Sequence, residues 1–399
     1  MKVLQINSFF TVGGPPRIVN GIYDTLKEQG HDCKIAAARE SFYVPEDSFR
    51  IGSDLGVKKN ALLARIFDNE GFSARAATKK LIKQIEEYGP DIIHLHNLHG
   101  YYINIEILFD YLKKADKKVF WTLHDCWSFT GHCAHFTVAG CDRWQTRCDS
   151  CPQKKTYPAS LVFSNAKRNF ERKKAAFTGV KDLTIITPSE WLANLVKKSF
   201  LKEYPIKVIH NGIDTNVFKP TPSNILEKHG IENKKIVLGV AQNWGENKGF
   251  GDFVKLSEML GNEYQIVMVG LTDEQIKSLP DNVLGITRTK SATELAEWYT
   301  AASVFVNTTY QDTYPTVNLE AQACGTQVIT YRTGGSPESV PKENVVDTGD
   351  VQALVGMINK ICDEVSATRM HEAELYDRKR LYQKYIEVYT YKKIDSERG

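Results

Sequence analysis

Two polar stretches in the second half of the chain could bind a phosphate and a sugar. Lys248 stands between a strand-like run and a helix-like run, where its ammonium group could reach phosphate oxygens beside the helix start. Asp312 and Glu320 are eight positions apart, across a loop and the start of another helix, and their carboxylates could accept hydrogen bonds from sugar hydroxyls. The alternatives are a solvated lysine and two acidic residues that only complement a helix dipole.

Polar side chains also end two strand-like runs in the first half. His94 and His96 alternate along one run, so they share a face and could bind a metal or a polar ligand, or be hydrogen-bonded core histidines. Asn97 follows them, and His124 and Asp125 end the next run. Because polar side chains at the end of a buried strand are costly unless satisfied, we expect His124 to belong to a ligand site.

A glycine pair, Gly13 and Gly14, follows the first strand-like run and would let the backbone approach a ligand closely. The alternative is an ordinary turn between a strand and a helix. The sequence lacks the G-x-G-x-x-G fingerprint, which disfavours a dinucleotide-dependent oxidoreductase.

Four cysteines form a cluster in the first half of the chain. Its members lie within 19 residues and are Cys133, Cys141, Cys148 and Cys151. The C-x-x-C pair favours a structural zinc ion held by the four thiolates, with His132 or His135 able to replace one of them. The alternatives are two disulfides, which a reducing compartment disfavours, and free thiols packed beside Trp144.

These residues stand in a chain whose strand-like runs alternate with segments of helical periodicity. Near-continuous apolar strands separated by helices predict parallel sheets covered on both faces, an α/β fold. Ser189 is expected to cap the helix Glu190–Phe200. The predicted strands are Val3–Asn7, Lys34–Ala38, Asp91–His96, Lys118–His124, Leu183–Pro188, Lys207–Asn211, Lys235–Ala241, Gln265–Gly270, Val283–Thr287, Val304–Thr309 and Thr326–Tyr331.

The alternation restarts near residue 206, and loop-type residues follow at 211–212 and 219–223. We therefore predict two tandem Rossmann-like, doubly wound domains, residues 1–205 and 206–376, that face one cleft with the carboxyl ends of their strands.

Composition narrows the class of protein. With 399 residues, 42% of them hydrophobic and 25% charged, the chain is typical of a globular two-domain protein. Without a secretory signal or a long apolar run, we expect a cytoplasmic location. Net charge is +3, and we expect no nucleic-acid partner. Residues 151–200 hold ten Lys and Arg against three Asp and Glu, which indicates either a solvated helix face or a patch at the inner membrane face.

Taken together, these motifs resemble the family 4 glycosyltransferases of the GT-B fold. The most specific part is Val304–Val340, which contains Asp312, Glu320 and the stretch Ala-Cys-Gly-Thr-Gln-Val-Ile-Thr. The resemblance implies a retaining hexosyltransferase that needs no metal for catalysis, a type that often builds bacterial surface polysaccharides. It also implies that a helix at about 377–399 packs back on the first, acceptor-side domain, and that the second domain binds the donor.

The resemblance assigns roles to individual residues. It places Gly13–Gly14 near the donor diphosphate, His124 near the reacting sugar, Lys248 on the phosphates, Asp312 on the donor sugar and Glu320 on the ribose. The other donor-binding candidates are Arg17, Gln242, Asn243, Tyr314, Pro315, Thr316 and Asn318. The candidates on the acceptor side are His94, His96, Asn97 and Asp125.

Two features depart from the family pattern. The first acid, Asp312, is one methylene shorter than the family's glutamate, and Gln242 or Asn243 stands where a basic residue is expected before Lys248. Arg17 or Arg288 would then have to supply the missing positive charge.

The expected activity is transfer of a sugar from a nucleoside diphosphate sugar to a lipid-linked or polysaccharide precursor, with retention of configuration. One alternative is a GT-B nucleotide-sugar epimerase or hydrolase that acts on the donor alone. The other is a non-catalytic GT-B partner of an active transferase.

Overall fold

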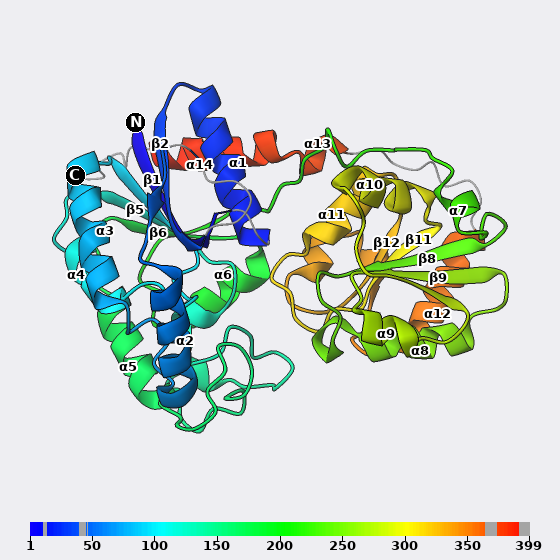
Figure 1. Cartoon of the computed structure of the whole chain (residues 1–399), viewed down its shortest axis with the longest axis horizontal. Coiled ribbons are helices and arrows are strands. Elements are labelled where there is room, and N and C mark those ends of the chain that lie inside the picture. The colour runs from blue at the N-terminus through cyan, green and yellow to red at the C-terminus, as the bar shows by residue number, and fades with distance from the viewer. Residues whose placement is uncertain (11–13, 40–44, 46, 364–372, 391–399) are drawn as a thin grey trace, which may run out of the picture. The chain divides into compact units, whose positions relative to one another are not determined.

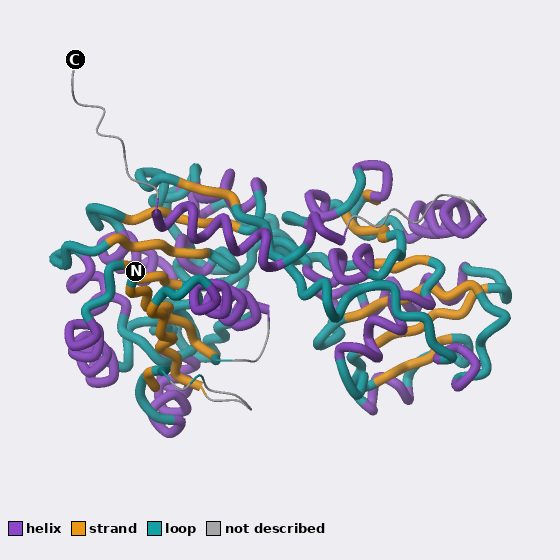
Figure 2. Tube along the Cα trace, turned by 90° about the horizontal axis from the view of Figure 1, so that it is seen from above, coloured by secondary structure: helices purple, strands orange, loops and turns teal. Residues whose placement is uncertain are grey.

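The computed structural model describes residues 1–10, 14–39, 45, 47–363 and 373–390. The chain divides into two compact units, one formed by Met1–His210 with Leu381–Gly399 and the other by Asn211–Arg380. Each unit contains a parallel sheet with helices on both faces (Figure 1, Figure 2). The predicted α/β class with two doubly wound parallel sheets is therefore confirmed.

The first unit has a seven-stranded sheet in the order β3-β2-β1-β4-β5-β6-β7. The strand order reverses beside β1, so the carboxyl ends of β1, β4 and β5 are neighbours at the edge where such sheets bind ligands. The strands are β1 (Lys2–Phe9), β2 (Asp32–Arg39), β3 (Phe49–Arg50), β4 (Ile92–Leu95), β5 (Lys118–Thr122), β6 (Leu183–Thr187) and β7 (Ile206–Val208).

Alternate residues of these strands pack into two different apolar layers. Leu4 and Trp121 belong to the larger cluster on one face, whereas Val3 and Phe120 face the opposite layer. Ser189 accepts a hydrogen bond from the backbone N–H of Leu192 and caps its helix as expected, although that helix already ends at Val196. The helices are α1 (Gly14–Glu28), α2 (Asp54–Phe67), α3 (Arg75–Tyr88), α4 (Ile105–Leu112), α5 (Ala166–Phe177) and α6 (Glu190–Val196), with short 3-10 turns at Trp127–Phe129 and Arg143–Gln145.

The last helix, α14 (Arg378–Thr390), contributes to the core of the first unit. Its side chains Tyr382, Tyr385 and Tyr389 are buried in the layer that also contains α1. Gly21 of α1 makes this packing possible, because a Cβ there would lie 2.1 Å from the ring of Tyr382. Residues 391–399 of the predicted helix lie outside the described residues.

The second unit has a six-stranded sheet in the order β10-β9-β8-β11-β12-β13. Helices α10 and α11 lie on one face and α8 and α12 on the other (Figure 1). The strands are β8 (Lys235–Val240), β9 (Tyr264–Val269), β10 (Val283–Ile286), β11 (Val304–Asn307), β12 (Val328–Tyr331) and β13 (Val345–Val346). The helices are α7 (Ile225–Lys228), α8 (Phe250–Met259), α9 (Asp273–Lys277), α10 (Ala292–Ala301), α11 (Thr316–Ala323), α12 (Val351–Asp363) and α13 (Ala373–Tyr376), with 3-10 turns at Glu246–Lys248, Ser336–Ser339 and Lys342–Asn344.

The structure corrects the predicted boundary between the domains. The division falls after His210 rather than after residue 205, because β7 pairs with β6 and completes the first sheet. The two-residue strands β3 and β13 were not predicted, because two residues show no alternation in the sequence. His96 and His124 follow β4 and β5 instead of ending them, so their side chains stand in the loops at the carboxyl edge.

Candidate active site

Lys248 is held by a tight turn at the carboxyl edge of the second sheet. It ends the 3-10 turn that follows β8, and Gly249, with a φ of 73°, is the N-cap residue before α8. A Cβ at Gly249 would lie 2.4 Å from the Thr308 hydroxyl oxygen and 2.5 Å from the Thr308 carbonyl oxygen. Only glycine therefore allows this turn to lie against the end of β11.

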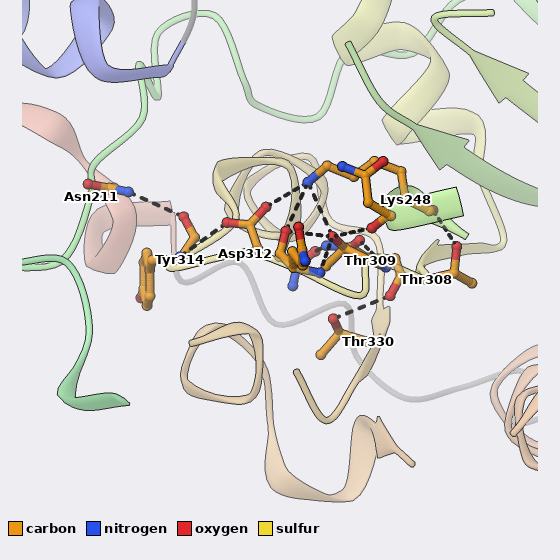
Figure 3. A network of polar contacts seen from close by, with 11 residues as sticks. Asn211, Lys248, Thr308, Thr309, Asp312, Tyr314 and Thr330 are labelled. Carbon is orange, nitrogen blue, oxygen red and sulfur yellow. Dashed lines mark hydrogen bonds and ion pairs between the residues drawn. The ribbon is translucent and has the colours of Figure 1, made fainter. Parts of the chain in front are cut away.

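The Lys248 ammonium group joins two segments that are far apart in the sequence. Its Nζ lies 3.0 Å from Asp312 Oδ2 and donates to Thr309 Oγ1 at 3.2 Å (Figure 3). About a third of the lysine side chain and a quarter of the aspartate side chain remain exposed. The structure thus brings together the two residues that the sequence separates by 64 positions.

The backbone around Asp312 is fixed on both sides. Its Oδ1 accepts a hydrogen bond from the backbone N–H of Tyr314, and its carbonyl oxygen accepts one from the N–H of Gly335. The neighbouring Gly334 has a φ of 57°, and a Cβ there would lie 1.9 Å from the Asp312 carbonyl oxygen. These contacts set the direction of the carboxylate before any ligand arrives.

The helix α11 begins directly after this loop. Pro315 stands at its N-cap position, its first turn contains no acidic residue, and no described side chain caps it. The first N–H groups of a helix carry partial positive charge, so this start can bind an anion. Thr316 is half-buried there, while Asn318 is fully buried between Asn307 and Ser339 and supports the loop.

Glu320 and Tyr314, two further donor-binding candidates, are both buried. Glu320 is 3% exposed, and its Oε2 accepts a hydrogen bond from the Tyr299 hydroxyl group at 3.1 Å. Tyr314 is buried, and its carbonyl oxygen accepts a hydrogen bond from Asn211 (Figure 3). The contact of Glu320 with a ribose stays a prediction.

The remaining donor-binding candidates stand on other loops and on a helix of the first unit. Gln242 and Asn243 are exposed in the loop after β8, and Arg288 is exposed after β10. Gly14 starts α1 in the first unit, with Arg17 exposed on the same helix. Gly13 lies outside the described residues.

In the first unit, three histidines gather at the ends of β4 and β5. The rings of His94 and His96 are 4.1 Å apart, so they share a face as predicted. His96 Nδ1 lies 3.1 Å from Nε2 of the partly exposed His124. Burial lowers the pKa of His94 to about 3 and of His124 to about 4, and it holds the pKa of His96 well below its usual value. All three are therefore neutral at physiological pH.

The structure corrects the acceptor-side role of His94 and His96. Both are almost completely buried, and His94 hydrogen-bonds with the hydroxyl groups of Thr122 and Tyr389 at 2.8 and 2.6 Å. They are the hydrogen-bonded core histidines that were the alternative interpretation. Asn97 remains partly exposed beside them.

Asp125 forms an ion pair with a histidine that the sequence analysis did not single out. His99 Nε2 lies 2.7 Å from Asp125 Oδ2, and His99 Nδ1 lies 2.9 Å from the Tyr157 hydroxyl group. Although burial opposes both charges, each partner favours the other, so the pKa of Asp125 falls to about 2 and that of His99 rises. The position of His99 after β4 was the only signal in the sequence.

The four cysteines of the predicted zinc site do not form a ready metal site. Cys133 and Cys151 hydrogen-bond to each other, which lowers the pKa of the Cys151 thiol to about 6. Cys141 and Cys148 pack against the apolar core. Within the described part of the chain, no group of three or more His, Cys, Asp or Glu residues is placed to hold a metal ion. Structural zinc therefore stays a prediction.

Comparison with known proteins identifies the family. Residues 12–217 match the family described as Glycosyltransferase Family 4, and residues 223–375 match the one described as Glycosyl transferases group 1. An Escherichia coli (strain K12) protein named for colanic acid biosynthesis as the glycosyl transferase WcaC is 25% identical over 350 residues, 83% of each chain. The N,N'-diacetylbacillosaminyl-diphospho-undecaprenol alpha-1,3-N-acetylgalactosaminyltransferase of Campylobacter jejuni is 25% identical over 219 residues, 49% of this chain and 57% of that protein.

The solved structure of Anabaena Alr3699/HepE in complex with UDP-glucose has the same fold. Its TM-score is 0.68 at 16% identity, and the match covers 97% of this chain and 99% of that chain. No helix among the described residues is long and apolar enough to cross a membrane. Because the first family match spans more than half of the 399 residues, this chain is a glycosyltransferase of Glycosyltransferase Family 4, with the GT-B fold.

Proposed function

We propose that this chain transfers a sugar from a nucleoside diphosphate sugar to a lipid-linked or polysaccharide precursor, with retention of the anomeric configuration. The observation that carries this proposal is the Lys248–Asp312 ion pair, which stands in the same unit as the uncapped start of α11. The Campylobacter relative is named for an undecaprenol-linked acceptor, and the Anabaena structure contains a nucleotide sugar; both support the proposal.

The ion pair suits a site in which each charged group exchanges its partner when the donor binds. Lys248 and Asp312 satisfy each other, which keeps two partly exposed charges in defined directions. A diphosphate would take over the ammonium group of Lys248, and a sugar hydroxyl group would donate to the carboxylate of Asp312. Lys248 would then stabilise the negative charge that grows on the departing nucleoside diphosphate.

The proposed reaction balances without a cofactor. The bond between the anomeric carbon and the β-phosphate oxygen breaks, and the acceptor oxygen bonds to the same face of that carbon. The acceptor proton moves to the leaving phosphate oxygen. Same-face attack accounts for retention without a protein nucleophile.

An assay of nucleotide release tests this function. Purified protein is given a panel of nucleoside diphosphate sugars, with and without an undecaprenyl diphosphate-linked sugar, and the product's anomeric configuration is read by NMR. We expect release of nucleotide that depends on the acceptor, and a product with the donor's configuration.

The other candidate activities give different results in the same assay. Release or epimerisation that is independent of the acceptor would identify a donor hydrolase or epimerase. No release with any donor would favour a non-catalytic partner protein. An inverted product would contradict the retaining mechanism.

We also propose that the first unit binds an anionic membrane surface, where a lipid-linked acceptor would be found. The basic excess of residues 151–200 is weak support for membrane binding. Arg172 pairs with Glu106, and Lys173 is buried against Trp127, so neither charge is available to a lipid surface. A better candidate is the apolar-basic face formed by α2 and the adjacent strap 161–163. Its exposed members are Leu55, Lys58, Lys59, Leu62, Arg65, Phe67, Leu161, Val162 and Phe163.

The contacts of the strap make this face continuous. The backbone N–H groups of Leu161 and Phe163 donate to carbonyl oxygens of α2 at 2.7 and 3.1 Å. The rings of Phe67 and Phe163 stack 5.8 Å apart. Binding at a lipid interface grows with the apolar area that is buried and with the attraction of nearby cations to anionic lipid, and this face supplies both. Each cation near an anionic surface contributes about 1 kcal/mol.

Liposome sedimentation tests this face. At low salt, the protein should sediment with vesicles that contain anionic lipid, and the double variant Leu62→Ser with Leu161→Ser should sediment less. Met259→Ser is the matched control, because Met259 is an exposed apolar residue of the second unit. Equal sedimentation of all three proteins would contradict the assignment.

A further inference from the structure

A row of hydrogen bonds runs from the core of the first unit to His124. The strand order β1-β4-β5 places Gln5, His96 and His124 next to one another. His96 Nε2 lies 3.1 Å from Gln5 Oε1, and His96 Nδ1 lies 3.1 Å from His124 Nε2. Gln5 and His96 are buried, whereas His124 is partly exposed at the ligand-binding edge.

The contacts of the side-chain nitrogen of Gln5 fix the orientation of its amide group. Its Nε2 donates to the Val19 carbonyl oxygen at 3.0 Å and approaches the Cys33 sulfur at 3.8 Å. A flipped amide would place its oxygen against the Val19 carbonyl oxygen, two acceptors facing each other. Gln5 Oε1 therefore faces His96, and an amide oxygen can only accept a hydrogen bond.

This acceptor determines the proton positions along the row. Because Gln5 Oε1 accepts, His96 must carry its proton on Nε2, and a neutral imidazole then has a lone pair on Nδ1. That lone pair accepts from His124, so His124 carries its proton on Nε2 and a lone pair on Nδ1. The neutral state on which this depends agrees with the burial that lowers the pKa of both histidines.

We propose that Gln5 and His96 are positioning residues that hold His124 in its Nε2–H tautomer, so that His124 Nδ1 can accept a hydrogen bond from a sugar hydroxyl group but cannot donate one. This inference rests on the proposed function for the role of the sugar, but the tautomer itself is a property of the ligand-free chain. His94 belongs to a separate pair of hydrogen bonds with Thr122 and Tyr389, so it supplies a control.

NMR of the full chain labelled with ¹⁵N-histidine tests the tautomer directly, because a protonated and an unprotonated ring nitrogen have different shifts and couplings. His124 signals are assigned by their loss in a His124→Gln variant. We expect His124 to be protonated on Nε2 in the wild-type chain at pH 7.5. Protonation on Nδ1, or a doubly protonated ring, would overturn the proposal without any variant.

Variants of Gln5 separate positioning from folding. Gln5→Met removes the acceptor at similar size, so both histidines should lose their fixed tautomers, and kcat should fall by about 10- to 100-fold, as for lost supporting contacts elsewhere. Tyr389→Phe removes a partner of His94 and should leave the His124 signals unchanged.

The outcomes separate this proposal from the proposed function. An unchanged His124 tautomer in folded Gln5→Met would overturn the role of Gln5 even if transfer is observed. The protein could instead transfer no sugar and still show a fixed Nε2–H tautomer that depends on Gln5. That result would support the positioning role of Gln5 and His96 and would contradict the proposed function.

Discussion

The two strand-end clusters, one in each unit, reach a defined geometry by opposite means. Lys248 and Asp312 are charged, partly exposed and held by glycine turns in loops. Gln5, His96 and His124 are uncharged, and the first two are buried among their own hydrogen-bond partners. A charged pair can exchange its partners for a ligand, whereas a buried neutral row keeps its arrangement because any unpaired group would be costly.

Under the function proposed above, this difference corresponds to a division of roles. The lysine–aspartate cluster would bind a diphosphate and a sugar that arrive and leave, and the histidine cluster would keep a hydrogen-bond acceptor in a fixed direction. Variants that alter one cluster should therefore have effects of a different kind from variants that alter the other.

The largest effect is expected from Lys248→Ala. The variant should lower kcat by about 100- to 1000-fold, as the loss of one preorganised charge donor does in other enzymes. Lys235→Ala is the control, since Lys235 is an exposed lysine of the same unit that pairs with Asp363. Both variants should keep the wild-type melting temperature, and wild-type turnover in Lys248→Ala would remove Lys248 from the site.

Gly249→Ala should have the next largest effect. The new methyl group would meet Thr308 in a left-handed backbone conformation, so the turn that carries Lys248 should shift and stability should fall by about 1–3 kcal/mol. Gly14→Ala is the control, because none of the residues that the structure describes has an atom within 4 Å of a Cβ at Gly14. Urea unfolding of both variants measures the difference, and equal midpoints would contradict the constraint.

The smallest effect concerns the charged pair beside the neutral histidines. Asp125→Asn keeps the shape of the side chain but removes its charge, so it should cost on the order of 1 kcal/mol at pH 5. The pKa of His99 is raised in the folded chain, so its contribution is present below pH 6.5, the usual value, and is lost as pH rises through the raised pKa. The pKa of Asp125 is lowered to about 2, so its contribution persists above pH 3.8 and is lost only as pH falls towards 2.

Urea unfolding at pH 5 and pH 9 checks this sign. The difference between the wild type and Asp125→Asn should be larger at pH 5, where both partners are charged. A larger difference at pH 9 would mean that the pair is not ionic.

His96 and His124 have the opposite effect on stability. Their pKa values are lowered in the folded chain, so the unfolded chain binds protons first as the pH falls. Acidification below pH 6.5 should therefore destabilise the folded state.

Particular residues show why the sequence predicted the architecture well. The apolar runs around Val3, Val119 and Ile266 are each a strand, because a strand buried on both faces must be apolar along its length. The glycosyltransferase family was identifiable from Val304–Val340, where the loop after β11 and the start of α11 lie. Two-residue strands such as β13 could not be predicted, because their pairing depends on a neighbour already in place.

The candidate site was only partly predictable for a related reason. Lys248, Asp312 and His124 stood out because charged or polar residues beside buried strands are unusual. The contacts of Gln5 and His99 are made with partners far away in the sequence, His96 in one case and Asp125 in the other. His94 and His96 were assigned to a ligand surface, although only their neighbours could show that both are buried.

The α/β class, the two-domain order and the glycosyltransferase family could all be inferred from the sequence, because they follow from local periodicity and from motifs within a short stretch. The pairing of the polar residues could be known only from the folded chain. Lys248 meets Asp312, and Gln5 meets His96, because parallel strands bring distant segments to a common edge. Burial then sets the charge on each group, since the free energy of holding a charge depends on the solvent that the fold removes.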